Sequence, residues 1–94
     1  MKPIRLSAHA LGYAAKRGFT VEEVEETIRG ESWEQTERGR LQCRRGLPYR
    51  DTWNGKWYET KLVRPIFVDE PDEIVVVTVY TYYFSRRHQD ENHV

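Results

Sequence analysis

The sequence has little of what marks secreted or membrane-spanning proteins. Its 94 residues include one cysteine, Cys43, and one methionine. A lone cysteine cannot form the internal disulfides that hold small extracellular domains together, which favours a reducing, cytoplasmic location. No apolar run approaches the roughly 18 residues of a membrane helix, and the first ten residues lack the apolar stretch of a signal peptide. We therefore expect a soluble cytoplasmic protein.

The chain also lacks net charge, because 15 Lys and Arg balance 15 Asp and Glu. These charges are nevertheless segregated along the sequence. Residues 22–34 carry six acids and one base, whereas residues 36–66 carry eight bases and three acids. A local positive field can attract a polyanion even when the whole chain is neutral. The basic segment therefore indicates either a surface for nucleic acid or a solvated sheet face with alternating arginines.

Two short helices are predicted near the N-terminus. Ser7 is a good N-cap for the first helix, and Gly18 lies where a glycine would end it. Thr20 and Glu23 form a T-x-x-E capping box for the second helix, and Gly30 ends it. The first helix has small apolar residues and the second has valine and isoleucine at helical spacing. We expect a helical hairpin packed on a sheet.

Strands are expected in the rest of the chain. Short strands are predicted at residues 32–36 and 41–45, and Asn54–Gly55 is typical of a two-residue hairpin turn. Residues 57–68 are predicted to form a strand whose successive side chains alternate between the two faces of a sheet. Residues 74–84 are β-branched and aromatic without a charge, which indicates a central strand. The predicted fold class is α+β, with two helices packed on an antiparallel sheet of three to five strands. Residues 1–84 form one domain in this prediction, and residues 85–94 form a polar, flexible tail.

Four short motifs resemble a family of small bacterial domains of unknown function. They are Ser7–Ala10, Arg17–Thr20, Val21–Val24 and Val76–Tyr80. The family is similar in layout to the RelE/BrnT-type toxins of toxin–antitoxin systems. This resemblance implies a RelE-like α+β fold, ribonuclease activity on RNA, and an antitoxin as a protein partner.

RNA cleavage by a 2′-hydroxyl needs a base, an acid and cations around the phosphate. We expect His9 to act as base or acid, with Tyr80 or Tyr82 as a proton donor or stacking platform. Lys61 and Arg64 are candidate phosphate clamps. They lie on opposite faces of a regular strand, so one phosphate contacts both only where the strand bends.

Several other side chains are candidates for contacts to nucleic acid. His9, Tyr13, Lys16 and Arg17 fall at i, i+4, i+7 and i+8, on one side of the first helix. Three arginines would extend a track for the anionic backbone, namely Arg38, Arg44 and Arg45. Three tryptophans would stack on bases, namely Trp33, Trp53 and Trp57. We expect no metal and no cofactor, since neither a convincing ligand cluster nor a glycine-rich phosphate loop is present.

Each candidate also has a structural interpretation. A histidine near a helix N-terminus is more often a packing or capping residue, and tyrosines on a central strand are more often core. Three functions stay open: a toxin-like endoribonuclease, a non-catalytic module that binds nucleic acid or protein, and a small self-associating protein that pairs through its edge strands.

Overall fold

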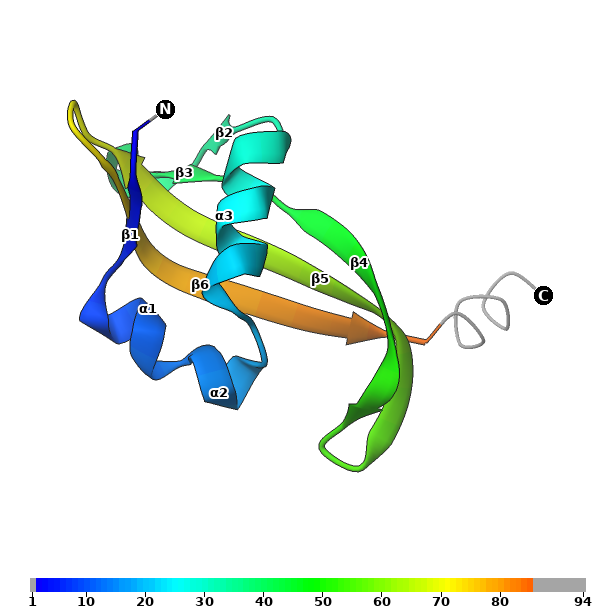
Figure 1. Cartoon of the computed structure of the whole chain (residues 1–94). Helices are drawn as coiled ribbons and strands as arrows, with labels where there is room; N and C mark the ends of the chain where they lie inside the picture. Colours follow the sequence, from blue (N-terminus) through cyan, green and yellow to red (C-terminus); the bar gives the residue numbers. More distant parts are fainter. Residues whose placement is uncertain (1, 86–94) are drawn as a thin grey trace.

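The computed structural model describes residues 2–85 and shows an α+β fold (Figure 1). Most of the tail expected at residues 85–94 lies outside the described residues. The helices are α1 (Ala8–Gly12), α2 (Ala14–Arg17) and α3 (Val21–Gly30). The strands are β1 (Ile4–Leu6), β2 (Glu34–Gln35), β3 (Leu41–Gln42), β4 (Arg45–Trp53), β5 (Lys56–Asp69) and β6 (Ile74–Phe84). None of these helices is long and apolar enough to cross a membrane.

The six strands form one sheet in the order β1-β6-β5-β3-β2, and β4 pairs with another part of β5. All pairs are antiparallel except β1 with β6, which is parallel. The α+β class is therefore confirmed, but the prediction of a purely antiparallel sheet of three to five strands is wrong. β1 escapes sequence analysis because three residues carry no periodic pattern. Only its pairing with a strand some 70 residues later makes it a strand.

The two central strands agree with the sequence pattern. β6 has the predicted bounds of 74–84, and β5 extends the predicted strand by one residue at each end. The turn between β4 and β5 has positive φ at both central residues, 52° at Asn54 and 81° at Gly55. This is the backbone that a type I′ turn requires, and it joins the paired residues Trp53 and Lys56.

The first predicted helix is divided at Tyr13, so the chain has three helices where two were expected. The Tyr13 amide donates to the carbonyl of Ala10 at 3.1 Å, a tightened turn that closes α1 after Gly12. Glycine at this position also weakens a helix. The capping box of α3 is confirmed, with bonds of 3.0 and 3.1 Å between Thr20 and Glu23.

The sheet has a covered face and an open face. α3 lies across β5 in Figure 1, and its Val24 and Ile28 pack in the same buried cluster as Val63, Phe67 and Val76 of the sheet. The opposite face, which we call the open face, carries the even-numbered side chains 60–66 of β5 and 78–84 of β6. Three aromatic side chains of β6 on this face are between 37% and 40% exposed.

Candidate functional site

Six side chains form a continuous row of rings and guanidinium groups. The row starts on α1, passes the end of α2 and continues on the open face. Neighbouring members lie between 4.1 and 5.7 Å apart, measured between ring centroids or from a guanidinium carbon to a ring centroid. In order, its members are His9, Tyr13, Arg17, Tyr80, Arg64 and Tyr82. We call this set the arginine–tyrosine row.

The centre of the row is Tyr80, whose ring lies between two cations. The guanidinium carbon of Arg17 lies 5.0 Å from the ring centroid, and that of Arg64 lies 4.9 Å from it. Both distances are within the roughly 6 Å over which a cation is attracted to an aromatic face. Tyr80 is 37% exposed, so this pair of cations and its shared ring border solvent.

Arg64 is held in place by the sheet and by two acceptors. It lies directly opposite Tyr80 in the β5–β6 register. One terminal nitrogen donates to Gln42 Oε1 and the other to the hydroxyl of Tyr82, both at 3.0 Å. The Nε of Arg64 is buried and has no hydrogen-bond partner within residues 2–85. Neutral acceptors thus orient this side chain without neutralising its charge.

Arg17 is held at the outer edge of β6. Its guanidinium donates to Thr78 Oγ1 at 3.2 Å and to the carbonyl of Val79 at 2.8 Å. Its own carbonyl accepts hydrogen bonds from the hydroxyls of Thr81 and Tyr83. The end of α2 is therefore tied to β6 on both sides of the strand, which positions Arg17 beside Tyr80.

Neither arginine of the row has an acidic partner among the described residues. Within residues 2–85, Arg17 and Arg64 form no ion pair, although six other Lys and Arg residues do. A hollow of about 250 Å³ lies beside Arg64 and Tyr80, and its lining includes Arg38, Arg40 and one acid, Glu37. The positive charge of this region is therefore only partly offset by the protein itself.

Three of the four predicted catalytic residues lie on the row: His9, Arg64 and Tyr80. The fourth, Lys61, lies on the covered face and is 6% exposed. Its Nζ lies 2.8 Å from a carboxylate oxygen of Glu23 and donates to the carbonyl of Gly18 at 2.9 Å. Lys61 and Arg64 thus face opposite sides of β5, as the alternation of the strand predicts, and the structure does not bring them together.

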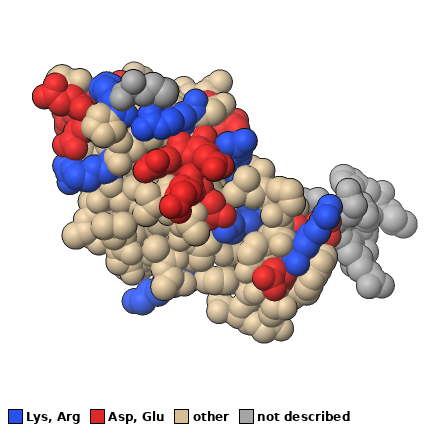
Figure 2. All heavy atoms as spheres, in the orientation of Figure 1, with Lys and Arg blue, Asp and Glu red and all other residues tan. Residues whose placement is uncertain are grey.

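Of the residues predicted to bind nucleic acid, Arg38 alone lines the hollow beside the row. Arg44 pairs with Glu34 at 3.3 Å, and Arg45 pairs with Glu31 at 3.7 Å. Figure 2 shows acidic side chains gathered over α3, and those that share a hollow with Arg45 are Glu22, Glu25 and Glu26. Arg45 therefore partly neutralises the acidic helix and does not extend the row.

The three tryptophans are not part of the row. Trp53 stacks on Tyr83 with centroids 5.0 Å apart, and Trp33 meets Phe67 edge-on at 5.1 Å. Trp57 is 51% exposed and lies next to the turn between β4 and β5. The first two are therefore packing residues, although Trp33 is still 40% exposed, and Trp57 is the most exposed of the three.

Sequence reasoning placed Tyr13 and Arg17 on the side of the first helix that carries His9, but it did not connect them to the sheet. The sequence signal for this grouping is the spacing of i, i+4 and i+8. The three side chains remain neighbours in the structure although the helix is divided at Tyr13. The missing information was that the end of α2 lies against Val79. That contact joins residues more than 60 positions apart in the chain.

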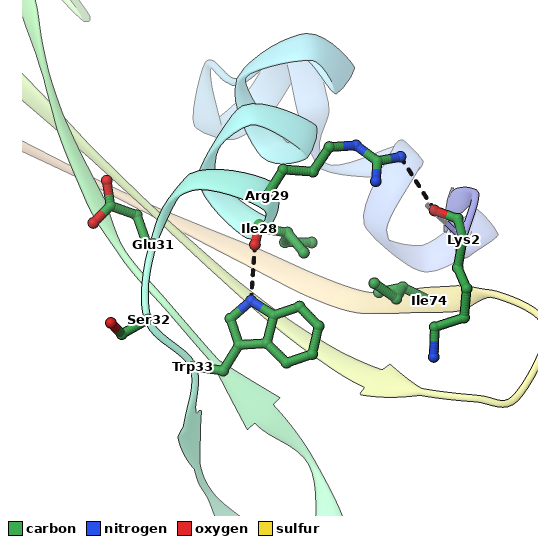
Figure 3. Close-up of a pocket in the computed structure, with 7 residues that line it drawn as sticks. All are labelled: Lys2, Ile28, Arg29, Glu31, Ser32, Trp33 and Ile74. Carbon is green, nitrogen blue, oxygen red and sulfur yellow. Dashed lines mark hydrogen bonds between the residues drawn. The ribbon is translucent and has the colours of Figure 1, made fainter.

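A larger hollow than the one beside the row lies at the C-terminal end of α3 (Figure 3). Its volume is about 770 Å³, and its lining includes Ile28, Trp33 and Ile74 with Lys2, Arg29 and Glu31. The indole of Trp33 donates to the carbonyl of Ile28 at 2.8 Å, which fixes one wall. Its apolar floor contrasts with the arginine-lined hollow beside the row.

Two other chemistries are disfavoured by the described residues. Residues 2–85 contain no group of three or more His, Cys, Asp or Glu side chains arranged to hold a metal ion. Burial, with a smaller contribution from Glu31, raises the pKa of the Cys43 thiol to about 11. A thiol with this pKa is protonated at neutral pH and is a poor nucleophile.

The two guanidinium groups of the arginine–tyrosine row can bind a phosphate, and its exposed rings can stack on a nucleobase. The same row contains one histidine. No protein-family model, curated protein or solved structure matches this chain.

Proposed function

We propose that this chain is an RNA-binding domain with the layout of a RelE/BrnT-type toxin, and that the arginine–tyrosine row is its RNA contact. The observation that carries the proposal is the position of Tyr80 between Arg17 and Arg64. Guanidinium groups bind phosphate through paired hydrogen bonds. Exposed aromatic rings stack on bases. An RNA ligand also agrees with the cytoplasmic location that the lone cysteine favours.

Charge balance supports an anionic ligand. Two guanidinium groups held around one ring repel each other, and neither has an ion-pair partner within residues 2–85. A phosphate between or beside them would offset that repulsion, and the attraction is strengthened where the surroundings are partly desolvated. The hollow lined by Arg38, Arg40 and Arg64 provides space for the sugar-phosphate backbone to continue.

We further propose that the domain cleaves the RNA it binds, because His9 lies in the same row, with its ring tilted against that of Tyr13 and the ring centroids 4.9 Å apart. In this proposal His9 takes the proton of a 2′-hydroxyl, whose oxygen attacks the adjacent phosphorus. The bond from phosphorus to the 5′-oxygen breaks, and the leaving oxygen takes a proton from Tyr80, which water restores. The products are a 2′,3′-cyclic phosphate and a 5′-hydroxyl end.

RNA binding is tested by the anisotropy of a labelled mixed-sequence RNA at several salt concentrations. Arg17→Ala and Arg64→Ala should each weaken binding and lower the slope of log affinity against log salt by about 1, since each removes one phosphate contact. Arg50→Ala is the matched control, because Arg50 is exposed and pairs with Glu59 at 3.5 Å away from the row. If all three variants bind like the parent protein, the row is not the RNA site.

Cleavage is tested by incubating the protein with the same RNA and analysing the ends of the products. His9→Ala should lower the rate about 10²-fold or more while leaving the dissociation constant unchanged, because general base catalysis typically contributes that much. Absence of cleavage, together with normal growth of cells that express the protein, would rule out the endoribonuclease. The domain would then be a binding module without catalysis.

A further inference from the structure

Three exposed aromatic side chains continue along β6 from the centre of the row. Tyr80 is 37% exposed, and Tyr82 and Phe84 are each 40% exposed. They occupy alternate positions of one strand and therefore share the open face. Because a strand rises by about 3.3 Å per residue, their side chains follow at intervals of about 7 Å. We call these three residues the aromatic ladder.

The ladder has a charged end and a neutral end. Tyr80 lies opposite Arg64 in the β5–β6 register, whereas Tyr82 lies opposite Leu62 and Phe84 lies opposite Thr60. The hydroxyl of Tyr82 accepts a hydrogen bond from Arg64 at 3.0 Å, which restrains the middle ring. The open face therefore joins a site for a phosphate to two further rings, of which Tyr82 contacts Arg64 and Phe84 lies opposite an uncharged residue.

We infer that the aromatic ladder stacks on two consecutive unpaired bases, through Tyr82 and Phe84, so that the ligand of this domain is single-stranded RNA. The inference rests on the proposed function and specifies its substrate class. Other β-sheet proteins recognise single strands by stacking two or three bases on aromatic residues of the sheet surface. The faces of bases in a duplex are already stacked on one another, so a duplex cannot use these rings.

The cations beside the ladder favour nucleic acid over an apolar protein partner. A protein surface that covered Tyr82 and Phe84 would also cover Arg64, which has no acidic partner within residues 2–85. Burying an unpaired charge is costly. In a single strand of RNA, one molecule supplies both a phosphate for the arginines beside Tyr80 and flat bases for the rings of Tyr82 and Phe84.

The aromatic ladder also determines which phosphate of the bound RNA is cleaved. The reacting phosphate lies at the Tyr80 end, beside the guanidinium groups of Arg17 and Arg64, and the nucleotides on one side of it lie over Tyr82 and Phe84. Cleavage therefore requires about two unpaired nucleotides on that side of the cut. A strand that becomes a duplex immediately beside the cut loses these contacts and is a poor substrate.

Binding is measured by anisotropy with labelled 2′-O-methyl oligonucleotides, which have no free 2′-hydroxyl and are not cut. A single strand of eight nucleotides is compared with a hairpin duplex that has the same number of phosphates. We expect the single strand to bind at least about tenfold more tightly, since base–aromatic stacking contributes about 1–3 kcal/mol per base and 1.4 kcal/mol corresponds to tenfold.

The variants separate stacking from charge. Tyr82→Leu and Phe84→Leu should each weaken binding of the single strand about fivefold or more and leave the salt slope unchanged, because no phosphate contact is lost. Tyr82→Phe retains the ring and should bind within about twofold of the parent. Leu11→Ala is the control for loss of exposed apolar surface, because Leu11 of α1 is 50% exposed and belongs to neither the row nor the ladder.

Three outcomes would overturn the inference that the aromatic ladder binds single-stranded RNA. The first is RNA binding that does not discriminate between single strand and duplex, which leaves the proposed function intact. The second is unchanged affinity of Tyr82→Leu and Phe84→Leu together with a change from dimer to monomer in sedimentation, which would make the open face a self-association surface. The third is no binding of any RNA, which would remove the proposed function as well.

Discussion

Lys61 on β5 and Glu23 on α3 form an ion pair with 2.8 Å between Nζ and Oε2, and the lysine is 6% exposed. Glu23 also accepts from the Thr20 amide in the capping box, so one carboxylate serves the helix start and the sheet. Lys61→Ala should therefore lower the free energy of unfolding by about 3 kcal/mol, the low end for a broken buried pair, because Glu23 is partly exposed. Lys56→Ala on the same strand is the exposed control. Equal urea midpoints for the two variants would contradict this structural role.

Gly18 is required by both its backbone and its surroundings. Its φ is +78°, and an added Cβ would lie 2.2 Å from the Tyr83 hydroxyl and 2.8 Å from the Trp53 ring. Gly39 has a similar φ of +71° but nothing within 4 Å. Gly39→Ala should cost about 1–2 kcal/mol for the left-handed backbone alone, and Gly18→Ala should cost clearly more. Thermal unfolding of the two variants measures the difference, and equal losses would show that the aromatic contact is unimportant.

Stability should fall at alkaline pH because the fold keeps a buried cysteine and a partly buried tyrosine protonated. Burial raises the pKa of Tyr83 from 10.0 to about 12, with smaller contributions from Tyr49 and Glu23, and that of Cys43 from 9.0 to about 11. The unfolded chain releases these protons at lower pH than the folded chain does. Their contribution is therefore complete below about pH 9 and is lost as the pH rises toward 12.

This pH dependence is measured as the unfolding midpoint between pH 7 and 11. Cys43→Ala should flatten the decline that begins near pH 9, and Tyr83→Phe should flatten the decline above pH 10. Tyr83→Phe also loses the bond of 2.9 Å to the carbonyl of Arg17, so its midpoint is lower at every pH. A decline that is equally steep in both variants would assign the effect to other groups.

The two proposed roles of Tyr80 are separable by substitution. Tyr80→Phe keeps the ring between Arg17 and Arg64 and removes the hydroxyl. We expect it to bind RNA with unchanged affinity but to cleave more slowly, since only the proton donor is lost. Tyr80→Ala should weaken both. If Tyr80→Phe cleaves RNA at the parent rate, Tyr80 is a stacking residue and another group protonates the leaving oxygen.

The elements that follow from local chemistry could be predicted from the sequence. The Thr20–Glu23 capping box and the Asn54–Gly55 turn depend on residues at most three positions apart, and both are confirmed. β6 is also predicted with its full length, because an uncharged run of β-branched and aromatic residues has no stable alternative in water. The strands β1 and β4 were missed. β1 is defined by its pairing with a distant strand. β4 pairs with the adjacent β5, but its own sequence contains Gly46 and Pro48, which do not favour a strand.

The candidate site divides in the same way. The sequence by itself determined that Lys61 and Arg64 lie on opposite faces of one strand, since successive side chains of a strand alternate. It also predicted that His9, Tyr13, Lys16 and Arg17 share one side of the first helix. Only the tertiary structure decided that the guanidinium groups of Arg17 and Arg64 lie 5.0 and 4.9 Å from the same Tyr80 ring, and that Lys61 pairs with Glu23. Local periodicity fixes the direction of a side chain, whereas its partner depends on long-range packing between β6, the end of α2 and α3.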